Sequence, residues 1–281
     1  MNQLLRKGPL TRALNVMRRI FKEEYRFYPK TWFLPEQYDQ FNSFCQYMND
    51  TCKKECPKKE LQNETKEPKT FIVKPNEGSQ GDGIILINDC DDYSKKVNKT
   101  RHFIVQEYIS NPYLIDGLKF DLRIYCVIAS INPLEIYICE EGMARFATLN
   151  YKAPSQSNLD QIYMHLTNYS LNKNNQEKFV RPENSESGSM NEDGSKRTLS
   201  SIYNNLRMKG HDVNKLKSDI DDIIVKTVIA LLPEIKVETA YEVNSIPYQQ
   251  QPEFFQVGYY LFLFRIILNA SQNYFSINLL Y

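Results

Sequence analysis

Residues 116–130, DGLKFDLRIYCVIAS, carry three charged side chains at alternating positions inside a run that is otherwise typical of a β-strand. Side chains two residues apart in a strand point to the same face of a sheet. Lys119, Asp121 and Arg123 therefore share one face, and apolar residues such as Leu122 and Ile124 share the other. Charges are costly to bury unless they pair or bind a charged ligand. We predict a cleft that handles phosphate groups, in which Asp121 orients the two cations. A solvated sheet face held by ion pairs is the alternative.

Lys74 forms a second candidate site, because it ends the apolar stretch TFIVKP directly before a turn that contains Gly78, Gly81 and Gly83. Glycines let backbone N–H groups approach an anion closely, and an adjacent lysine adds positive charge. The residue order differs from the GxxxxGK[ST] pattern of a P-loop. These features together predict a phosphate-binding turn, and a plain hairpin turn is the alternative for these residues taken alone.

Three polar segments elsewhere in the chain are further candidates. Residues 106–109, QEYI, end an apolar run, and the backbone of such a strand end can recognise the edge of a purine. Arg145 follows a predicted hairpin, and its planar guanidinium suits a carboxylate. Residues 165–173, HLTNYSLNK, form a polar loop, for which a hydrogen-bonded turn is the alternative. We expect His165 to be structural, since no serine or cysteine nucleophile pattern accompanies it.

The chain that must position these residues has 281 residues, of which 42% are hydrophobic and 25% charged, as in an ordinary globular protein. The formal net charge of +1 gives no chain-wide bias toward nucleic acid or membrane. The N-terminus has no apolar core of the signal-peptide type. The spacing of cysteines and histidines matches no common zinc site, so no metal ligand is assigned.

Composition divides the chain into three parts. Residues 1–68 are predicted to include an exposed linker with a lysine-rich insertion. Residues 69–257 carry the strand-like runs and the candidate sites. Residues 258–281 contain one charge, Arg265, and are predicted to be an atypical tail outside the fold.

Hydrophobic periodicity places several elements within these parts. A basic helix is predicted over residues 10–28, and an exposed, lysine-rich segment follows over 46–69. The strand at 119–130 is expected to pair with LEIYICEEG as a hairpin. A polar, mobile loop is predicted over 174–200 and a second helix over 214–232. The mixture predicts an α/β (α+β) fold class.

Four motifs occur in an order and spacing that resemble the tubulin–tyrosine ligase-like family over residues of about 10 to 235. They are TFIVKP…GSQGDGI, IVQEYISNPYLIDGLKFDLRIY, PLEIYICEEGMARFATLNY and HLTNYSLNK. KFDLRIY, ARFATLNY and LTNYSLNK are nearer the polyglutamylase branch of the family than tyrosine ligase itself. The resemblance implies an ATP-grasp-like fold, with a mixed or antiparallel central sheet flanked by helices and incomplete at both ends. It further implies that residues 1–68 are the remnant of an N-terminal or linker region and that residues 69–257 form the catalytic domain.

The resemblance also implies roles for single residues. The charged strand face is implied to be catalytic: Lys119, Asp121 and Arg123. The incoming amino acid is implied to contact four residues: Arg145, Tyr169, Ser170 and Lys173. Contacts with the nucleotide are implied for thirteen residues: Lys74, Gln80, Gly81, Gly83, Ile84, Gln106, Glu107, Tyr108, Ile109, Lys119, Asp121, Thr167 and Asn168.

The implied reaction is an ATP-dependent joining of a carboxylate and an amine. ATP phosphorylates an acceptor glutamate side chain in an α/β-tubulin tail, and the amine of free glutamate attacks the acyl-phosphate. The positive residues would stabilise the transferred phosphoryl group. The implied partners are tubulin tails and microtubules, with no nucleic acid or membrane. The implied location is the cytoplasm, on the cytoskeleton, including the cilium or basal body.

The resemblance weakens after residue 235, where the family expects a Gly-Tyr-Asp strand and a later Glu-x-Asn that bind Mg²⁺. Tyr260 stands at the position of that Asp, and no acidic residue follows Glu253. Glu242 and Asn244 match the Glu-x-Asn pattern but lie before that strand, so they are not assigned as metal ligands. The chain as written is therefore expected to be incomplete as a ligase. A non-catalytic protein that binds tubulin or microtubules is the alternative function.

Overall fold

The computed structural model describes residues 7–59, 69–78, 81–97, 101–175, 194–245, 260–268 and 275–277. For residues 52–59, 242–245, 260–268 and 275–277 it describes the backbone alone. Helices pack against two sheets, and every pairing between described strands is antiparallel. The predicted α/β class with an antiparallel central sheet is confirmed.

The smaller sheet has the spatial order β1 (Thr31–Leu34), β4 (Phe103–Glu107), β2 (Phe71–Pro75) and β3 (Ile85–Ile87). One face packs under α2 (Tyr38–Lys59) and α3 (Cys90–Lys96), where Phe71 and Val73 contribute to an aromatic core with Trp32 and Phe41. Because side chains alternate along a strand, Lys74 projects from the opposite face. Lys74 thus lies on the face of the smaller sheet that is turned away from α2 and α3.

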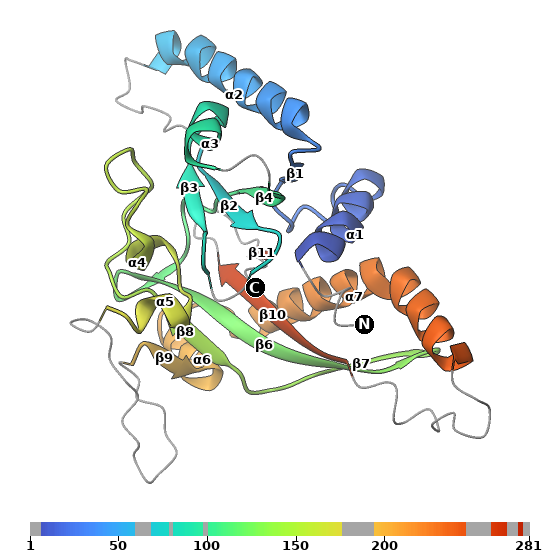
Figure 1. Cartoon of the computed structure of the whole chain (residues 1–281). Coiled ribbons are helices and arrows are strands. Elements are labelled where there is room, and N and C mark those ends of the chain that lie inside the picture. Colours follow the sequence, from blue (N-terminus) through green and yellow to red (C-terminus); the bar gives the residue numbers. More distant parts are fainter. Residues whose placement is uncertain are drawn as a thin grey trace.

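The larger sheet is built around the long strand β6 (Leu118–Ile131). Its main order is β11 (Phe275–Ile277), β10 (Tyr260–Leu268), β6, β8 (Met143–Phe146) and β9 (Lys196–Thr198). Two further strands pair with β6: β5 (Leu114–Ile115) and β7 (Leu134–Ile138). In Figure 1, β6 crosses the lower part of the view, and the smaller sheet lies between it and α2.

The apolar face of β6 is buried under three helices: α1 (Lys7–Ile20), α6 (Leu199–Met208) and α7 (Val213–Ser245). Leu122 and Ile124 of β6 belong to the same core as Leu14 of α1 and Ile224 of α7. The alternating charged positions of β6 therefore lie on the face turned away from these helices. Two short helices, α4 (Ile162–His165) and α5 (Tyr169–Asn172), lie between β8 and β9 in the chain, in the segment around HLTNYSLN.

Two helices are longer than the sequence predicts. The helix predicted over 214–232 continues to Ser245, because buried Leu231 and Ile235 extend its apolar stripe past Pro233. The segment predicted as an exposed linker from residue 46 is helical as far as Lys59, which is an error of the sequence analysis. Buried Phe41 and Cys45, four residues apart, anchor the first turns of that helix to the sheet.

Two other segments contain strands that were not predicted. Within the predicted loop 174–200, residues 196–198 form β9, and residues 176–193 lie outside the described part of the chain. Within the predicted tail, β10 pairs with β6 from Tyr260 opposite Ile128 to Ile266 opposite Leu122. The division of the chain into three domains stays a prediction. None of the described helices combines the length and the apolar character needed to span a bilayer.

Candidate functional site

Lys74, at the end of β2, is buried with its ammonium group against β4. The residue is 2% exposed, and its Nζ donates a hydrogen bond of 2.8 Å to Oε1 of Gln106. Gln106 in turn donates from Nε2 to the hydroxyl of Thr31 on β1, at 2.9 Å. A buried cation needs polar surroundings. These two hydrogen bonds supply them and hold the ammonium group of Lys74 in a fixed position.

Lys119, on the charged face of β6, is 1% exposed and contacts the end of β4. Its Nζ donates to the hydroxyl of Tyr108 at 2.6 Å and lies 4.0 Å from the centre of the same ring. Gln106 and Tyr108 are two residues apart and so project from the same side of the chain. Sequence analysis assigned residues 106–109 to the adenine edge and missed that two of their side chains position both lysines.

His165 continues this chain of buried polar groups. Its Nδ1 lies 3.1 Å from the hydroxyl of Tyr108, and its Nε2 lies 3.0 Å from the carbonyl oxygen of Asn158. The carbonyl oxygen accepts only, so the network assigns the proton to Nε2 and leaves Nδ1 to accept from Tyr108. The expected structural role of His165 agrees with its burial, and through Tyr108 it also orients Lys119.

The pKa of His165 is lowered from 6.5 to about 4. The first cause is burial of the ring, and the second is the nearby charge of Lys119; the hydrogen bond to the carbonyl of Asn158 acts in the opposite direction. Burial likewise raises the pKa of Tyr108 well above its ordinary value. Both side chains are therefore neutral at pH 7, so Lys119 carries the positive charge of this chain of contacts.

The low pKa of His165 predicts a pH dependence of stability. Between pH 6.5 and about 4 the unfolded chain binds a proton at this position and the folded chain does not. The free energy of unfolding therefore decreases as the pH falls through this interval. We expect a smaller decrease in His165→Gln, which keeps a neutral donor and acceptor. Urea unfolding at a series of pH values measures the difference, and parallel curves for the two proteins would contradict it.

Asp121 and Arg145 form a buried ion pair across β6 and β8. The two residues are direct partners in the strand register, and Nη2 of Arg145 donates to Oδ2 of Asp121 at 2.8 Å. They are 0% and 7% exposed, and Lys119 on the same face is also buried. The alternative of a solvated sheet face is therefore wrong.

Arg123 adds a further cation to this face of β6. Burial lowers the pKa of its guanidinium, and the neighbouring charge of Arg145 lowers it further, whereas Asp121 acts in the opposite direction. Within the described part of the chain, Nε of Arg123 and Nε of Arg145 are buried without a hydrogen-bond partner. The two guanidinium groups therefore keep donors available for an anionic ligand.

Gly81 brings the glycine turn against the loop that follows α4. Its φ is +94°, and a Cβ at this position would lie 2.8 Å from Nδ2 of Asn168. Gly83 also has a positive φ, of +66°, and a Cβ there would lie 2.9 Å from Cγ of Pro75. Side chains at either glycine would be strained and would meet neighbouring atoms, so the turn packs closely against Asn168 and Pro75. Gln80 lies outside the described residues.

Asn172, which sequence analysis did not select, holds that loop in place. Its Oδ1 accepts from the backbone N–H and the hydroxyl of Thr148, at 3.0 and 2.9 Å. Its Nδ2 donates to the carbonyl oxygens of Leu166 and Asn168, at 2.8 and 3.0 Å. Thr167, between them, is 1% exposed. A single asparagine in a polar loop carries no local signal for these contacts, because its partner Thr148 follows β8.

The residues predicted for the amino acid are only partly brought together. Tyr169 is 37% exposed, and Nζ of Lys196 lies 3.6 Å from the centre of its ring. Lys196 is the register partner of Arg145 in the pairing of β8 with β9, so Tyr169 lies near that strand. Ser170 is half-buried and Lys173 is exposed. Among the described residues, no hydrogen bond or ion pair joins the side chain of Lys173 to Arg145.

The strand end at 106–109 uses part of its backbone within the fold. The N–H groups of Glu107 and Tyr108 donate to the carbonyl oxygens of Lys30 and Thr70, both at 2.9 Å. Oε1 of Glu107 pairs with Lys69 at 2.9 Å, and Ile109 is buried. A contact between this segment and adenine would therefore have to use groups other than the backbone N–H groups of Glu107 and Tyr108.

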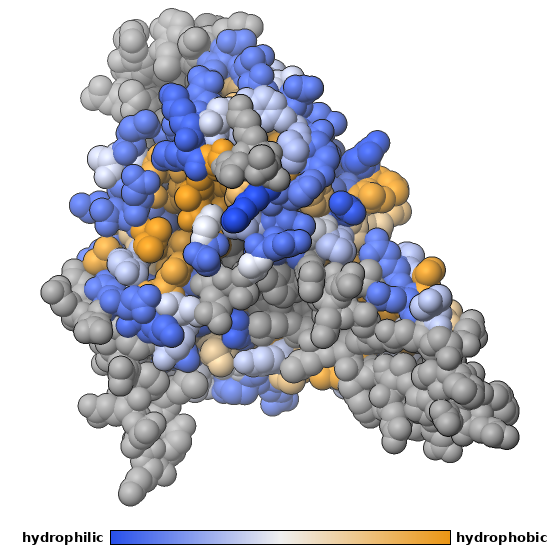
Figure 2. Space-filling view, in the orientation of Figure 1, coloured by the Kyte–Doolittle hydropathy of each residue, from blue (hydrophilic) through white to orange (hydrophobic). Residues whose placement is uncertain are grey.

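An apolar cluster adjoins the lysines. It consists of Ile72, Ile84, Leu86, Tyr108, Leu159 and Leu166. Figure 2 shows hydrophobic residues gathered near β2 and β3, with hydrophilic residues around them. A cavity of about 80 Å³ beside Leu159 and His165 is far smaller than sites for drug-sized ligands, which are about 300–1,000 Å³. A base would therefore lie over the apolar surface rather than inside this cavity.

Magnesium ligands are not identified by the described side chains. No three acidic, histidine or cysteine side chains gather among them as a metal site. Asp121, the buried carboxylate of the charged face, is occupied by Arg145. The backbone of Glu242 and Asn244 lies in the last turns of α7, and their side chains are outside the description. The described side chains therefore offer cations to an anionic ligand and do not supply an oxygen cage for Mg²⁺.

Comparison with known proteins connects this site to one family. The model of the tubulin-tyrosine ligase family matches residues 1–262. The chain is 46% identical over 238 residues to tubulin polyglutamylase TTLL11 of Mus musculus and 43% identical over 236 residues to tubulin polyglutamylase ttll-11 of Caenorhabditis elegans. It is 40% identical over 236 residues to a probable beta-tubulin polyglutamylase of Tetrahymena thermophila.

These similarities cover most of this chain and a minor part of each relative. Each alignment includes 84% of the chain, but 30%, 31% and 18% of the mouse, nematode and Tetrahymena proteins. The chain thus spans less than a third of the length of these relatives. The matched range includes the buried lysines, the ion pair and the loop held by Asn172.

Proposed function

Because the chain belongs to the tubulin-tyrosine ligase family, we propose that it is an ATP-dependent ligase that joins free glutamate to glutamate side chains of tubulin tails. The observation that carries the proposal is the pair of buried ammonium groups, Lys74 and Lys119, held by two side chains of one strand end. Buried lysines positioned by Gln106 and Tyr108 suit a multiply charged phosphate group.

The residues present suit ATP in two respects. The lysines and Arg123 supply positive charge, and the apolar cluster offers a surface for the base. ATP would supply the phosphoryl group that turns an unreactive carboxylate into an acyl donor. The part of this chain is to hold the phosphates and to stabilise the negative charge with groups that are already in position.

The incoming glutamate is proposed to bind beside the ion pair of Asp121 and Arg145. Arg145 uses Nη2 for Asp121, and its Nε stays available for a carboxylate of the amino acid. Tyr169, Ser170 and Lys173 are proposed to complete this region, with Tyr169 nearest to the strand of Arg145. A fixed guanidinium that selects a carboxylate would orient the amine of glutamate toward the activated acceptor.

The relatives are named as tubulin polyglutamylases, which supports tubulin tails and microtubules as partners of this chain. On the same ground we propose a location in the cytoplasm on the cytoskeleton, including the cilium or basal body. The proposal includes neither nucleic acid nor membrane as a partner.

Incorporation of labelled glutamate into microtubules tests the proposed function. ATP-dependent incorporation by the 281-residue chain that is abolished in Lys119→Met, which loses a charge at the proposed phosphate site, would support ligase activity. The control is Lys209→Met, an exposed lysine at the end of α6, the helix that packs on the apolar face of β6. A folded chain that binds an ATP analogue yet transfers no glutamate would contradict ligase activity. That outcome would support the expectation that this chain is incomplete, and the alternative of a non-catalytic tubulin-binding protein.

A further inference from the structure

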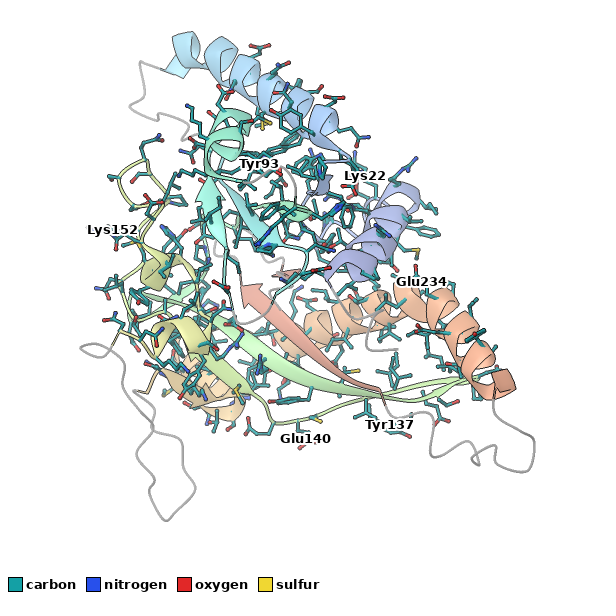
Figure 3. The ribbon with its side chains drawn as sticks, in the orientation of Figure 1. Lys22, Tyr93, Tyr137, Glu140, Lys152 and Glu234 are labelled. Carbon is teal, nitrogen blue, oxygen red and sulfur yellow. The ribbon has the colours of Figure 1, made fainter. Side chains whose placement is uncertain are left out.

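A second basic region, separate from the charged face of β6, lies between α1 and β1. A cavity of about 930 Å³ opens there, and Trp32 and Phe33 form part of its wall. Figure 3 shows Lys22 in this region, near α1 and the lower end of α2. The cavity, called the basic groove below, is lined by five cations: Arg12, Arg18, Arg19, Lys22 and Lys30.

The positive charge of the basic groove is only partly neutralised by the protein. Among its described lining residues Glu36 is the one carboxylate, and its Oε1 lies 3.0 Å from Nδ1 of His102. Behind the groove, Glu107 pairs with Lys69 at 2.9 Å and accepts from the backbone N–H of Lys30. Five cations thus face two carboxylates that already have partners.

Repulsion among these cations contributes to the lowered pKa of Lys30. Burial lowers the pKa of its ammonium group most strongly, and Glu107 acts in the opposite direction. The charges of Lys69, Arg18 and Lys22 lower the pKa further. Like charges at this range disfavour one another, and an anion placed among them would relieve the repulsion.

The rest of the groove wall suits a peptide better than a bare polyanion. The guanidinium of Arg12 lies 5.3 Å from the ring centre of Phe33, and Nζ of Lys30 lies 4.3 Å from that of Phe44. Stacking on aromatic rings holds the charged ends in defined places. Val16, which also lines the cavity, is 53% exposed. Apolar surface between fixed cations accommodates the carbon atoms that separate the carboxylates of an acidic peptide.

The edge of β1 is closed to strand addition, so recognition must come from side chains. β1 is the terminal strand of the smaller sheet. Nδ2 of Asn15 donates to the carbonyl oxygen of Thr31 at 3.1 Å. Gln37 accepts the N–H of Phe33 with its side chain and donates its own N–H to the carbonyl oxygen of Phe33. A peptide bound by strand addition needs these backbone groups free, so the cations provide the available contacts.

We propose that the basic groove binds an acidic peptide segment through its carboxylates, at a distance from the residue that is modified. The identity of this peptide as a stretch of tubulin tail rests on the proposed function. Thr31 lines the groove and accepts from Gln106, which holds Lys74, so the groove lies directly across β1 and β4 from the lysine site. An acceptor chain anchored in the groove would be retained near the lysines between successive additions.

Fluorescence anisotropy with a labelled oligoglutamate peptide tests the groove without ATP and without catalysis. Arg19→Gln combined with Lys22→Gln should weaken peptide binding about tenfold at low salt, because two exposed ion pairs are lost. Added salt should reduce the difference, since exposed charges are screened. The matched control combines Lys152→Gln with Lys209→Gln, which removes the same charge from two exposed positions outside the groove. Figure 3 shows Lys152 on the side of the molecule opposite to Lys22.

The outcomes separate the groove from the proposed function. Loss of peptide affinity with unchanged affinity for an ATP analogue supports the groove, whether or not glutamate is incorporated. Equal peptide affinity in the wild type and the groove variant would overturn the proposal, as would an equal loss in the control. A single-stranded oligonucleotide that binds more tightly than the peptide, and that loses affinity in the groove variant, would also overturn it and assign the groove to nucleic acid.

Discussion

Replacing Lys119 or Lys74 with methionine is expected to weaken the binding of a non-hydrolysable ATP analogue about tenfold to a hundredfold for each lysine, the range that one hydrogen bond to a charged group supplies. Both ammonium groups are nearly inaccessible and are held by Tyr108 and Gln106 before any ligand binds. Methionine keeps an unbranched apolar stem of similar length, so the measured loss reports the missing charge. Titration calorimetry on the two variants gives the affinities.

The control for this experiment is Lys209→Met, whose side chain is exposed at the end of α6. Its affinity for the analogue should equal that of the wild type within about twofold, because a distant exposed charge is screened. Thermal unfolding of each variant shows whether it is folded at the temperature of the titration. Wild-type affinity in both buried-lysine variants would move the phosphates away from this site and remove the main support for the proposed function.

Asp121→Leu is expected to lower the free energy of unfolding by about 3–5 kcal/mol, the usual loss when one member of a buried ion pair is removed. Asp121 and Arg145 are direct register partners on adjacent strands, and their contact is 2.8 Å long in a region without solvent exposure. The substitution leaves the guanidinium of Arg145 beside Arg123 without a compensating carboxylate. Urea unfolding measures the loss.

The double variant Asp121→Leu/Arg145→Leu provides the test of mechanism. It should recover a substantial part of the stability lost in Asp121→Leu, because no uncompensated charge remains buried. Losses that simply add in the double variant would show that the two residues contribute independently. In that case the charged face of β6 would be held by other contacts, and Arg145 would not depend on Asp121 for its position.

The parts of the site that lie on one strand were predictable from the sequence. Alternation along residues 119–123 gave the correct face for each side chain, because the repeat of a strand is two residues regardless of its neighbours. Lys74 and Gly81 were also selected from the sequence, since a lysine beside a glycine turn is a local pattern, and their role toward a nucleotide stays a prediction. The resemblance to the polyglutamylase branch is confirmed by the relatives, and it rested on four such local motifs.

The contacts that join strands to one another were not predictable. Tyr108, His165 and Lys119 come from three elements and meet only because the two sheets face each other. The basic helix of the groove was predicted, but the groove itself was not, because Arg12, Arg18 and Arg19 lie on α1, Lys22 and Lys30 lie on the connection to β1, and the strand Thr31–Leu34 was not recognised. Its four residues pair with β4 at an edge, and a run this short carries no periodic signal of its own.

The two faces of β6 also constrain how its length can change in evolution. One face fills the core under α1, α6 and α7, and the other holds the charged residues of the site. A single inserted or deleted residue within the strand would exchange the faces beyond that point. Lys119 or Asp121 would then face the helices, and Leu122 would lie on the face of the proposed phosphate site. A relative whose aligned sequence has a gap within residues 119–128 would therefore have lost either the packing of this core or the charged face of the site.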